Sequence, residues 1–161
     1  MASTWDREML FTIGKAMGEE FWSFGKHQQL GPCIDLCLDP RAGRSAESGG
    51  EDPYLSGQTG ASVIKGIQTT PVIATVKHFM VESKQSYRHN CNQIYTDRWM
   101  MEHFGTNFRT SVQEGASMSI MSSYNLLNGV HGCRKSSFAS NNTQRALGIS
   151  LLCSFRLGCS S

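Results

Sequence analysis

The sequence predicts an α/β fold built on a parallel β-sheet. Short apolar runs typical of buried strands alternate with longer segments in which apolar residues recur at every third or fourth position. Such alternation is typical of βαβ units, in which a crossover helix makes consecutive strands parallel. The strand runs are almost continuously apolar, as expected when helices cover both faces of a sheet. This pattern leaves two architectures open, a doubly wound sheet and a piece of an eightfold barrel.

The first predicted helix covers residues 4–24 and ends at Gly25. Five of its apolar residues are spaced to share one face: Met9, Leu10, Ile13, Met17 and Phe21. Residues 30–38, LGPCIDLCL, then form a mostly apolar run that predicts a buried strand. A loop rich in glycine, arginine and acidic residues follows at 39–52.

Asp52 and Pro53 predict the start of the second helix, because an acidic N-cap followed by proline is a common helix beginning. We expect this helix to end near Gln68. The second strand is the β-branched run at residues 72–76, VIATV, which leads into the sequence KHF.

The third helix and strand follow a polar loop at residues 82–96. Asp97 is expected to cap the helix, and five residues form its apolar side: Trp99, Met100, Phe104, Phe108 and Val112. Residues 118–124, MSIMSSY, predict the third strand.

Polar residues come directly after each of the predicted strands. Parallel sheets bind their ligands at the carboxyl ends of the strands, so we expect a ligand site there. The residues at these positions are Asp39, Arg41, Arg44, Lys77, His78, Tyr124 and Asn125.

Composition excludes several classes of function. The net charge is +2 and the basic residues are scattered, which argues against nucleic-acid binding. No apolar run is long enough to cross a bilayer, and the opening residues lack a signal-peptide pattern. The six cysteines form no zinc pattern, and neither glycine-rich phosphate motif is present.

Longer motifs surround the three strand ends. Residues 30–54 contain DPRAGR and ESGGEDPY, residues 72–79 read VIATVKHF, and residues 120–130 read IMSSYNLLNGV. Each resembles a motif of the family 3 glycoside hydrolases of the β-glucosidase type. Residues 2–6, ASTWD, are similar to a segment just upstream in that family. The resemblance extends from residue 2 to about residue 133, in order and with similar spacing.

The resemblance implies that residues 1–135 belong to the family's N-terminal domain, a (β/α)₈ TIM-type barrel with parallel strands that is incomplete here at both ends. It implies retaining hydrolysis of terminal β-linked glucose or a related sugar in a β-glucoside or short β-glucan. No cofactor, metal, nucleic acid or membrane partner is implied. The other expected partners are the remainder of the barrel and a second domain, and the implied location is extracellular.

Five residues match sugar-site positions of the family. Arg44, Lys77 and His78 match its sugar-binding Arg and Lys-His pair, and Met121 and Tyr124 match positions that line the same pocket. Arg and Lys offer many donors to sugar hydroxyls, and buried donors reject ligands that leave them unpaired. The resemblance therefore predicts a substrate-binding site made of these five residues.

The same side chains also have structural interpretations. Arg44 could brace its loop by pairing with Glu47 or Asp52. Lys77 could be a solvated strand end, and His78 a hydrogen-bonded core histidine. Sugar binding is favoured for Arg44, Lys77 and His78 because all three converge on one rim of the predicted barrel.

Other candidates are weighed in the same way. Met121 is by default core filler, and Tyr124 could anchor a turn. Asp35 lies inside a buried run, so it must be paired or protonated, and we interpret it as structural.

The resemblance ends near residue 135. In the family, a strand ending in Val-Ser-Asp-Trp carries the nucleophile, but residues 143–161, TQRALGISLLCSFRLGCSS, do not match it. Read back into allowed codons and shifted by one base, this stretch becomes LREPWGFRCFVVSDWGA, which contains the motif. We therefore interpret residues 136–161 as a frameshifted tail. We expect the chain to lack both the nucleophile and the acid/base, and to have negligible activity alone.

Other functions stay open at the level of sequence. The chain could be a non-catalytic carbohydrate-binding remnant or the product of a gene model or pseudogene. It could also be a doubly wound domain that binds an anionic ligand at the same strand ends.

Overall fold

The computed structural model describes residues 1–132 of the chain. Its main sheet has three strands in the order β1-β2-β4: β1 (Gln28–Gln29), β2 (Ile73–Phe79) and β4 (Ser119–Ser122). Both strand pairs are parallel. The α/β fold with a parallel sheet, as the sequence predicts, is confirmed.

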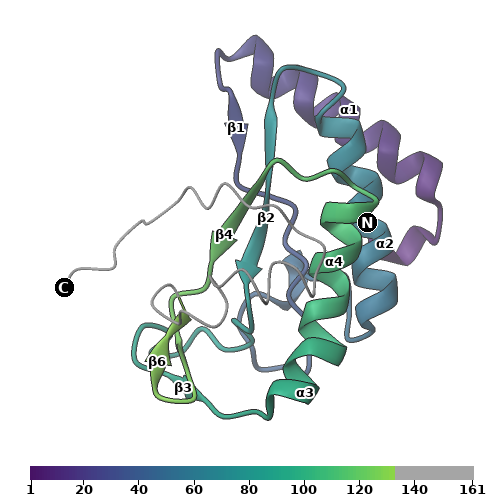
Figure 1. The fold of residues 1–161 in the computed structure, drawn as a ribbon. Helices are drawn as coiled ribbons and strands as arrows, with labels where there is room; N and C mark the ends of the chain where they lie inside the picture. The colour runs from purple at the N-terminus through teal and green to yellow at the C-terminus, as the bar shows by residue number, and fades with distance from the viewer. Residues whose placement is uncertain (133–161) are drawn as a thin grey trace.

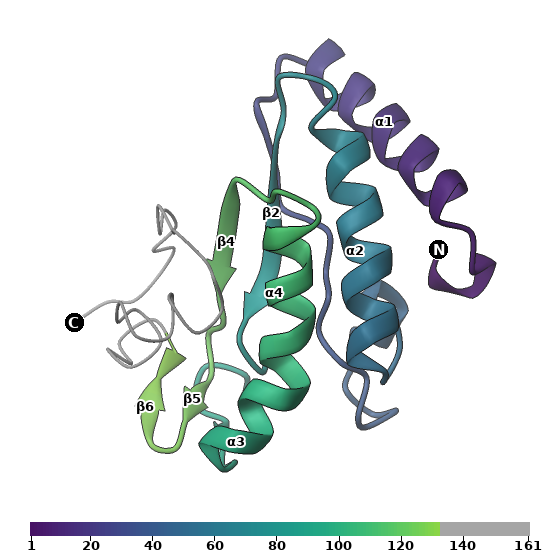
Figure 2. The same cartoon turned by 45° about the vertical axis from the view of Figure 1, so that its right-hand side comes forward.

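Three helices lie side by side along one face of this sheet (Figures 1 and 2). They are α1 (Arg7–Ser23), α2 (Pro53–Ile67) and α4 (Thr106–Gln113). A short helix α3 (Asp97–Met100) and the π-helical turn η3 (Met101–Gly105) lead directly into α4. Two 3₁₀ turns, η1 (Ala2–Thr4) and η2 (Ser45–Glu47), lie before α1 and α2.

Side-chain caps explain where the helices begin. The Asp52 carboxylate accepts a hydrogen bond from the backbone N–H of Leu55 at 2.6 Å, and Pro53 is the first residue of α2. This start is the predicted one. The third helix differs from prediction, because Thr96 is its N-cap and Asp97 is its first residue. Aspartate at that position still favours the helix through the helix dipole.

Helix α1 contacts α2 through smaller residues than the predicted apolar face contains. Leu10, Gly14 and Gly18 are buried against α2, whereas Met9 is 48% exposed and Met17 is only partly buried. Two glycines permit a very close approach, since a Cβ added to Gly14 would lie 2.3 Å from a carbonyl oxygen of α2. The contact line therefore follows the glycines rather than the row of large apolar residues.

The predicted strand at 30–38 is wrong in its position: the first strand, β1, comes before that run. Within the run, an isolated bridge joins Cys33 to Lys77 of β2. Pro32 has no backbone N–H to donate, which interrupts the ladder. The run is nevertheless buried at Ile34, whose carbonyl oxygen accepts hydrogen bonds from Ser56 Oγ at 3.0 Å and from Asn107 Nδ2 at 2.6 Å.

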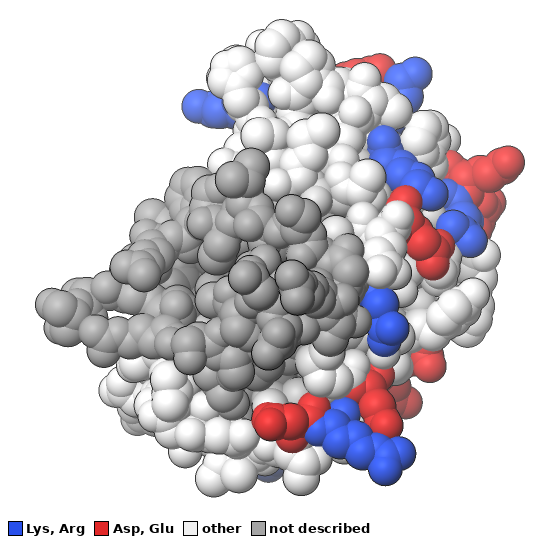
Figure 3. Space-filling view, in the orientation of Figure 1, with Lys and Arg blue, Asp and Glu red and all other residues white. Residues whose placement is uncertain are grey.

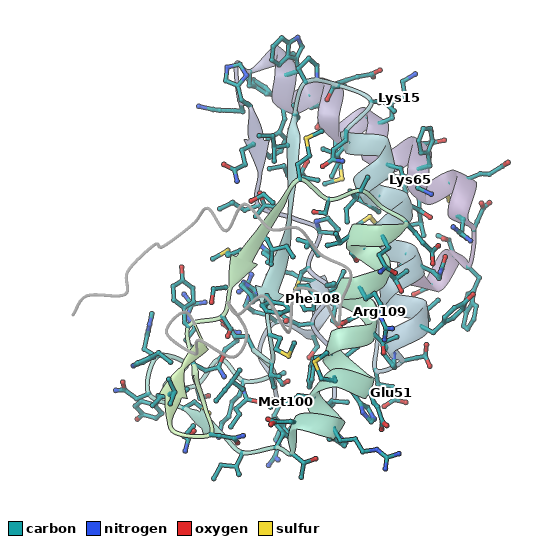
Figure 4. All side chains as sticks on the ribbon, in the orientation of Figure 1. Lys15, Glu51, Lys65, Met100, Phe108 and Arg109 are labelled. Atoms are coloured by element: carbon teal, nitrogen blue, oxygen red, sulfur yellow. The ribbon has the colours of Figure 1, made fainter. Side chains whose placement is uncertain are left out.

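The hydrophobic core fills the space between the sheet and the helices. Phe108 points from α4 toward β2 and meets Phe79 edge-on, with ring centroids 5.0 Å apart (Figure 4). Arg109, the next residue, lies on the exposed side of α4. The predicted apolar side of this helix is confirmed at Met100, Phe104 and Phe108, which are all fully buried.

A second small sheet lies beyond the carboxyl end of β4 (Figure 1). It has the order β3-β5-β6, with β3 (Asn92–Gln93), β5 (Leu126–Leu127) and β6 (Val130–His131). Asn128 and Gly129 connect β5 to β6, and both have positive φ, at 49° and 83°. Asn-Gly is the preferred sequence for such a hairpin turn. The sequence prediction has no strands here.

The visible surface carries basic and acidic side chains side by side over the helices (Figure 3). This mixed distribution agrees with the small net charge. Among residues 1–132, no helix has the length and apolar character needed to cross a membrane. The predicted aberrant tail at 136–161 lies outside the described residues.

Candidate functional site

The candidate site lies where the chain leaves the carboxyl end of β2. Lys77 and His78 are consecutive residues of β2, and Lys77 is in register with Met121 on β4. Arg44 comes from the loop between β1 and α2, which places three separate segments around one strand end. Of the five sequence-predicted residues, Arg44, Lys77 and His78 therefore lie together, and Met121 lies on the neighbouring strand.

Glu47 joins the two cations of the site. Its carboxylate accepts two hydrogen bonds from Arg44, one from Nε at 2.8 Å and one from Nη2 at 2.9 Å. The Lys77 ammonium lies 3.6 Å from the same carboxylate. The guanidinium holds the pKa of Glu47 below its ordinary value, and the same hydrogen bonds raise the pKa of Arg44. Arg44, Glu47 and Lys77 thus form one ionic network.

His78 extends this network into the interior. Its Nδ1 lies 2.6 Å from Asp35 Oδ2, and its backbone N–H donates to Asp35 Oδ1 at 3.2 Å. On the other side of the ring, Nε2 lies 3.2 Å from Nη1 of Arg44. The imidazole therefore links a buried carboxylate to the guanidinium.

A hollow opens beside the network. Its volume is about 350 Å³, and it lies between the segment at 29–33, the helices α1 and α2, and the side chains of Glu47 and Lys77. Leu10 and Val63 form part of its apolar wall. Of the five predicted residues, only Lys77 lines this hollow, so the hollow adjoins the network and does not enclose it.

Cys33, Asp35 and His78 bring three potential metal-ligand atoms within 4.8 Å of one another. The Cys33 thiol, however, donates to Asp35 Oδ2 at 3.3 Å, and burial raises the pKa of that thiol. A metal would require both this proton and the one shared between His78 and Asp35 to leave. We assign no metal to the cluster, because its donors are already joined by hydrogen bonds.

Tyr124 belongs to a neighbouring cluster. Arg88 lies over its ring at 4.7 Å from the centroid, and the His89 ring is 5.0 Å away. Its backbone N–H donates at 3.1 Å to Glu82, whose side chain is fully buried and also lies 3.5 Å from Arg88. Glu82 and Arg88 hold the loop after β2 against the residues that follow β4.

Two predicted strand-end residues stand apart from the site. Asp39 and Arg41 pair with each other at the surface, with 2.8 Å between Oδ2 and Nη2. Hydrogen bonds from Arg41 lower the pKa of Asp39 to about 2. The local pair thus satisfies both side chains, and their part in a ligand site stays a prediction.

Glu47 and Asp35 are site residues that the sequence prediction does not include. Glu47 follows Arg44 by three positions, a spacing at which opposite charges pair readily. Asp35 lies between two buried apolar residues, and a carboxylate in such a run must have a partner. That requirement is the signal for Asp35, but it does not identify His78 as the partner.

Comparison with known proteins identifies relatives. Residues 1–144 match the family model described as glycosyl hydrolase family 3 N terminal domain. Over 131 residues, 81% of this chain, it is 36% identical to probable beta-glucosidase K of Emericella nidulans and 39% identical to a beta-glucosidase of Kluyveromyces marxianus. The match spans only 16% of the length of each of these relatives.

Solved structures give the same result. Beta-glucosidase 3B from Thermotoga neapolitana in complex with alpha-D-glucose is 34% identical with a TM-score of 0.88, covering 92% of this chain and 21% of that one. Beta-glucosidase from Kluyveromyces marxianus in complex with glucose is 36% identical with a TM-score of 0.84, covering 87% of this chain and 17% of that one.

Proposed function

Because the chain belongs to glycosyl hydrolase family 3, we propose that it is the part of a β-glucosidase barrel that holds the sugar at the cleavage point. The proposal rests above all on one observation, the convergence of Arg44, Lys77 and His78 at the end of β2. Two cationic donors and an imidazole suit the hydroxyl groups of a sugar. The glucose bound in two similar structures supports glucose as the ligand.

We expect binding without turnover from this chain. A retaining glycosidase needs two carboxyl groups about 5–5.5 Å apart, one as nucleophile and one as acid/base. The carboxylates at this site are already engaged, Asp35 with His78 and Cys33, and Glu47 with Arg44 and Lys77. The proposed role of the chain is therefore recognition of the sugar.

The remaining parts of the proposal concern the whole protein. The matched segment is a small share of its relatives. We propose that further barrel strands and a second domain complete the enzyme, that its substrate is a β-glucoside or short β-glucan, and that it acts outside the cell. We also propose that residues 136–161 are a frameshifted reading of the nucleophile strand. Coding DNA whose shifted frame does not encode Ser-Asp-Trp would refute the frameshift.

Titration of the full chain with glucose tests the proposed binding. Calorimetry should detect binding to the unchanged chain, and Lys77→Ala should weaken it about 10- to 100-fold, the usual effect of losing one hydrogen bond to a charged group. Lys65→Ala is the matched control, because Lys65 is exposed on α2 away from the site, and it should leave the affinity unchanged. Absence of glucose binding, or equal loss in both variants, would contradict the proposal.

A further inference from the structure

A buried carboxylate stands behind the imidazole of the candidate site. Asp35 is 7% exposed and His78 is 2% exposed. The carboxylate accepts from three donors, namely the Nδ1–H of His78, its backbone N–H and the Cys33 thiol. Such a site fixes the direction of each hydrogen bond, because the ionised carboxylate only accepts.

The contact with Arg44 shows which ring nitrogen of His78 carries the proton. A guanidinium has five N–H donors and no acceptor, so an Arg44 N–H facing Nε2 must donate to it. Nε2 therefore presents its lone pair, and Nδ1 carries the hydrogen that Asp35 accepts. The opposite tautomer would set two donors against each other at Nε2 and leave Asp35 facing a lone pair at Nδ1.

We propose that Asp35 is a positioning residue that holds His78 in the Nδ1–H tautomer, so that Nε2 accepts from Arg44 and holds the guanidinium at the site. The imidazole has one in-plane lone pair to offer, and Arg44 occupies it. This part rests on the proposed function: Arg44, held by His78 and Glu47, donates its remaining N–H groups to a sugar hydroxyl. Asp35 thereby sets the direction in which Arg44 meets the sugar.

Nitrogen-15 NMR of the labelled full chain tests the tautomer directly. Long-range proton–nitrogen spectra distinguish Nδ1–H from Nε2–H, and a His78→Gln variant assigns the signals. We expect His78 to be protonated at Nδ1 only. His103 is the internal control, because its Nδ1 faces the Trp99 carbonyl oxygen at 3.2 Å and needs no carboxylate to hold the same tautomer.

Two variants separate the role of Asp35 from that of Arg44. Asp35→Asn, made together with Arg44→Met so that no donor faces Nε2, should shift His78 toward Nε2–H, while His103 keeps its signals. Arg44→Met should leave His78 protonated at Nδ1, because Asp35 is still in place. If the double variant fails to fold, the unchanged chain and Arg44→Met still decide the matter.

The outcomes are distinct. A protonated Nε2 in the unchanged chain, an unaltered tautomer in the folded double variant, or a tautomer shift in Arg44→Met alone would each overturn the proposal. Failure of the unchanged chain to bind glucose would instead refute the sugar-site function, while the tautomer result would stand by itself.

Discussion

Arg44 shows how one side chain can be both structural and available for binding. It forms the local pair with Glu47 that its spacing indicates, and it also reaches His78, which is 34 positions away in the chain. Its side chain remains 28% exposed, so ligand atoms can approach it. The structural interpretation of Arg44 is therefore compatible with the proposed sugar contact.

The acid sensitivity of the Arg44–Glu47 pair follows from the depressed pKa of Glu47. Hydrogen bonds from Arg44 are the main cause of this lowering. The stability that the pair contributes should be complete above the ordinary value of about 4.3 and should be lost as the pH falls through the lower folded value. A carbon-13 titration of the Glu47 carboxyl should show its midpoint below the ordinary value of a glutamate carboxyl.

Arg44→Met is the control for this titration. It removes the guanidinium, so the midpoint should rise toward the ordinary value, which an effect of Lys77 alone would not produce. An unchanged midpoint in that variant would show that Arg44 does not set the pKa of Glu47.

At the level of residues, sequence reasoning identified the cations of the site better than their carboxylate partners. Lys77 and His78 adjoin a strand end and carry a family motif, so their position was predictable. Asp35 is 43 residues from His78, and only the parallel packing of the two segments brings them together. Charge pairing at that separation depends on tertiary structure, which composition and spacing do not contain.

Among the elements, the close contact of α1 with α2 depends on the absence of side chains. We predict that Gly14→Ala lowers the free energy of unfolding by about 1–3 kcal/mol, the usual effect of overpacking, because the added Cβ would meet Val63 O at 2.3 Å. Alanine has a higher helix propensity than glycine by about 1 kcal/mol, so propensity alone predicts that the variant is more stable than the unchanged chain. Urea unfolding followed by circular dichroism measures the difference.

The matched control exchanges the same two residue types on the exposed side of the helix. Ala16→Gly should cost about 1 kcal/mol through helix propensity, since Ala16 is exposed. A Gly14→Ala variant more stable than the unchanged chain would contradict the packing account.

The elements differ in how well their sequence predicts them. The second helix has a local start signal at Asp52 and Pro53, and the structure confirms it. The first strand lacks such a signal for its end, and the burial of its apolar run depends on side chains of α2 and α4 that bind the Ile34 carbonyl. The hairpin at Asn128 and Gly129 has a clear turn sequence, and attention to that signal would have predicted it.

At the scale of the whole molecule, the strands of the main sheet are parallel, with β1 and β4 as its outer strands among the described residues. Parallel strands with helices on the outside are the repeating unit of an eightfold barrel. The sequence pattern alone could not separate such a barrel from a doubly wound sheet, because both repeat the same unit. The similar solved structures, with TM-scores of 0.88 and 0.84, are β-glucosidases and resolve this ambiguity.

The most direct test of the sugar-site account is a crystal structure of the full chain grown with glucose. We predict one glucose at the carboxyl end of β2, with its hydroxyl groups within hydrogen-bond distance of Arg44 and Lys77, and with His78 Nε2 still facing Arg44. Glucose bound elsewhere, or these three side chains directed to different faces of the molecule, would contradict the account.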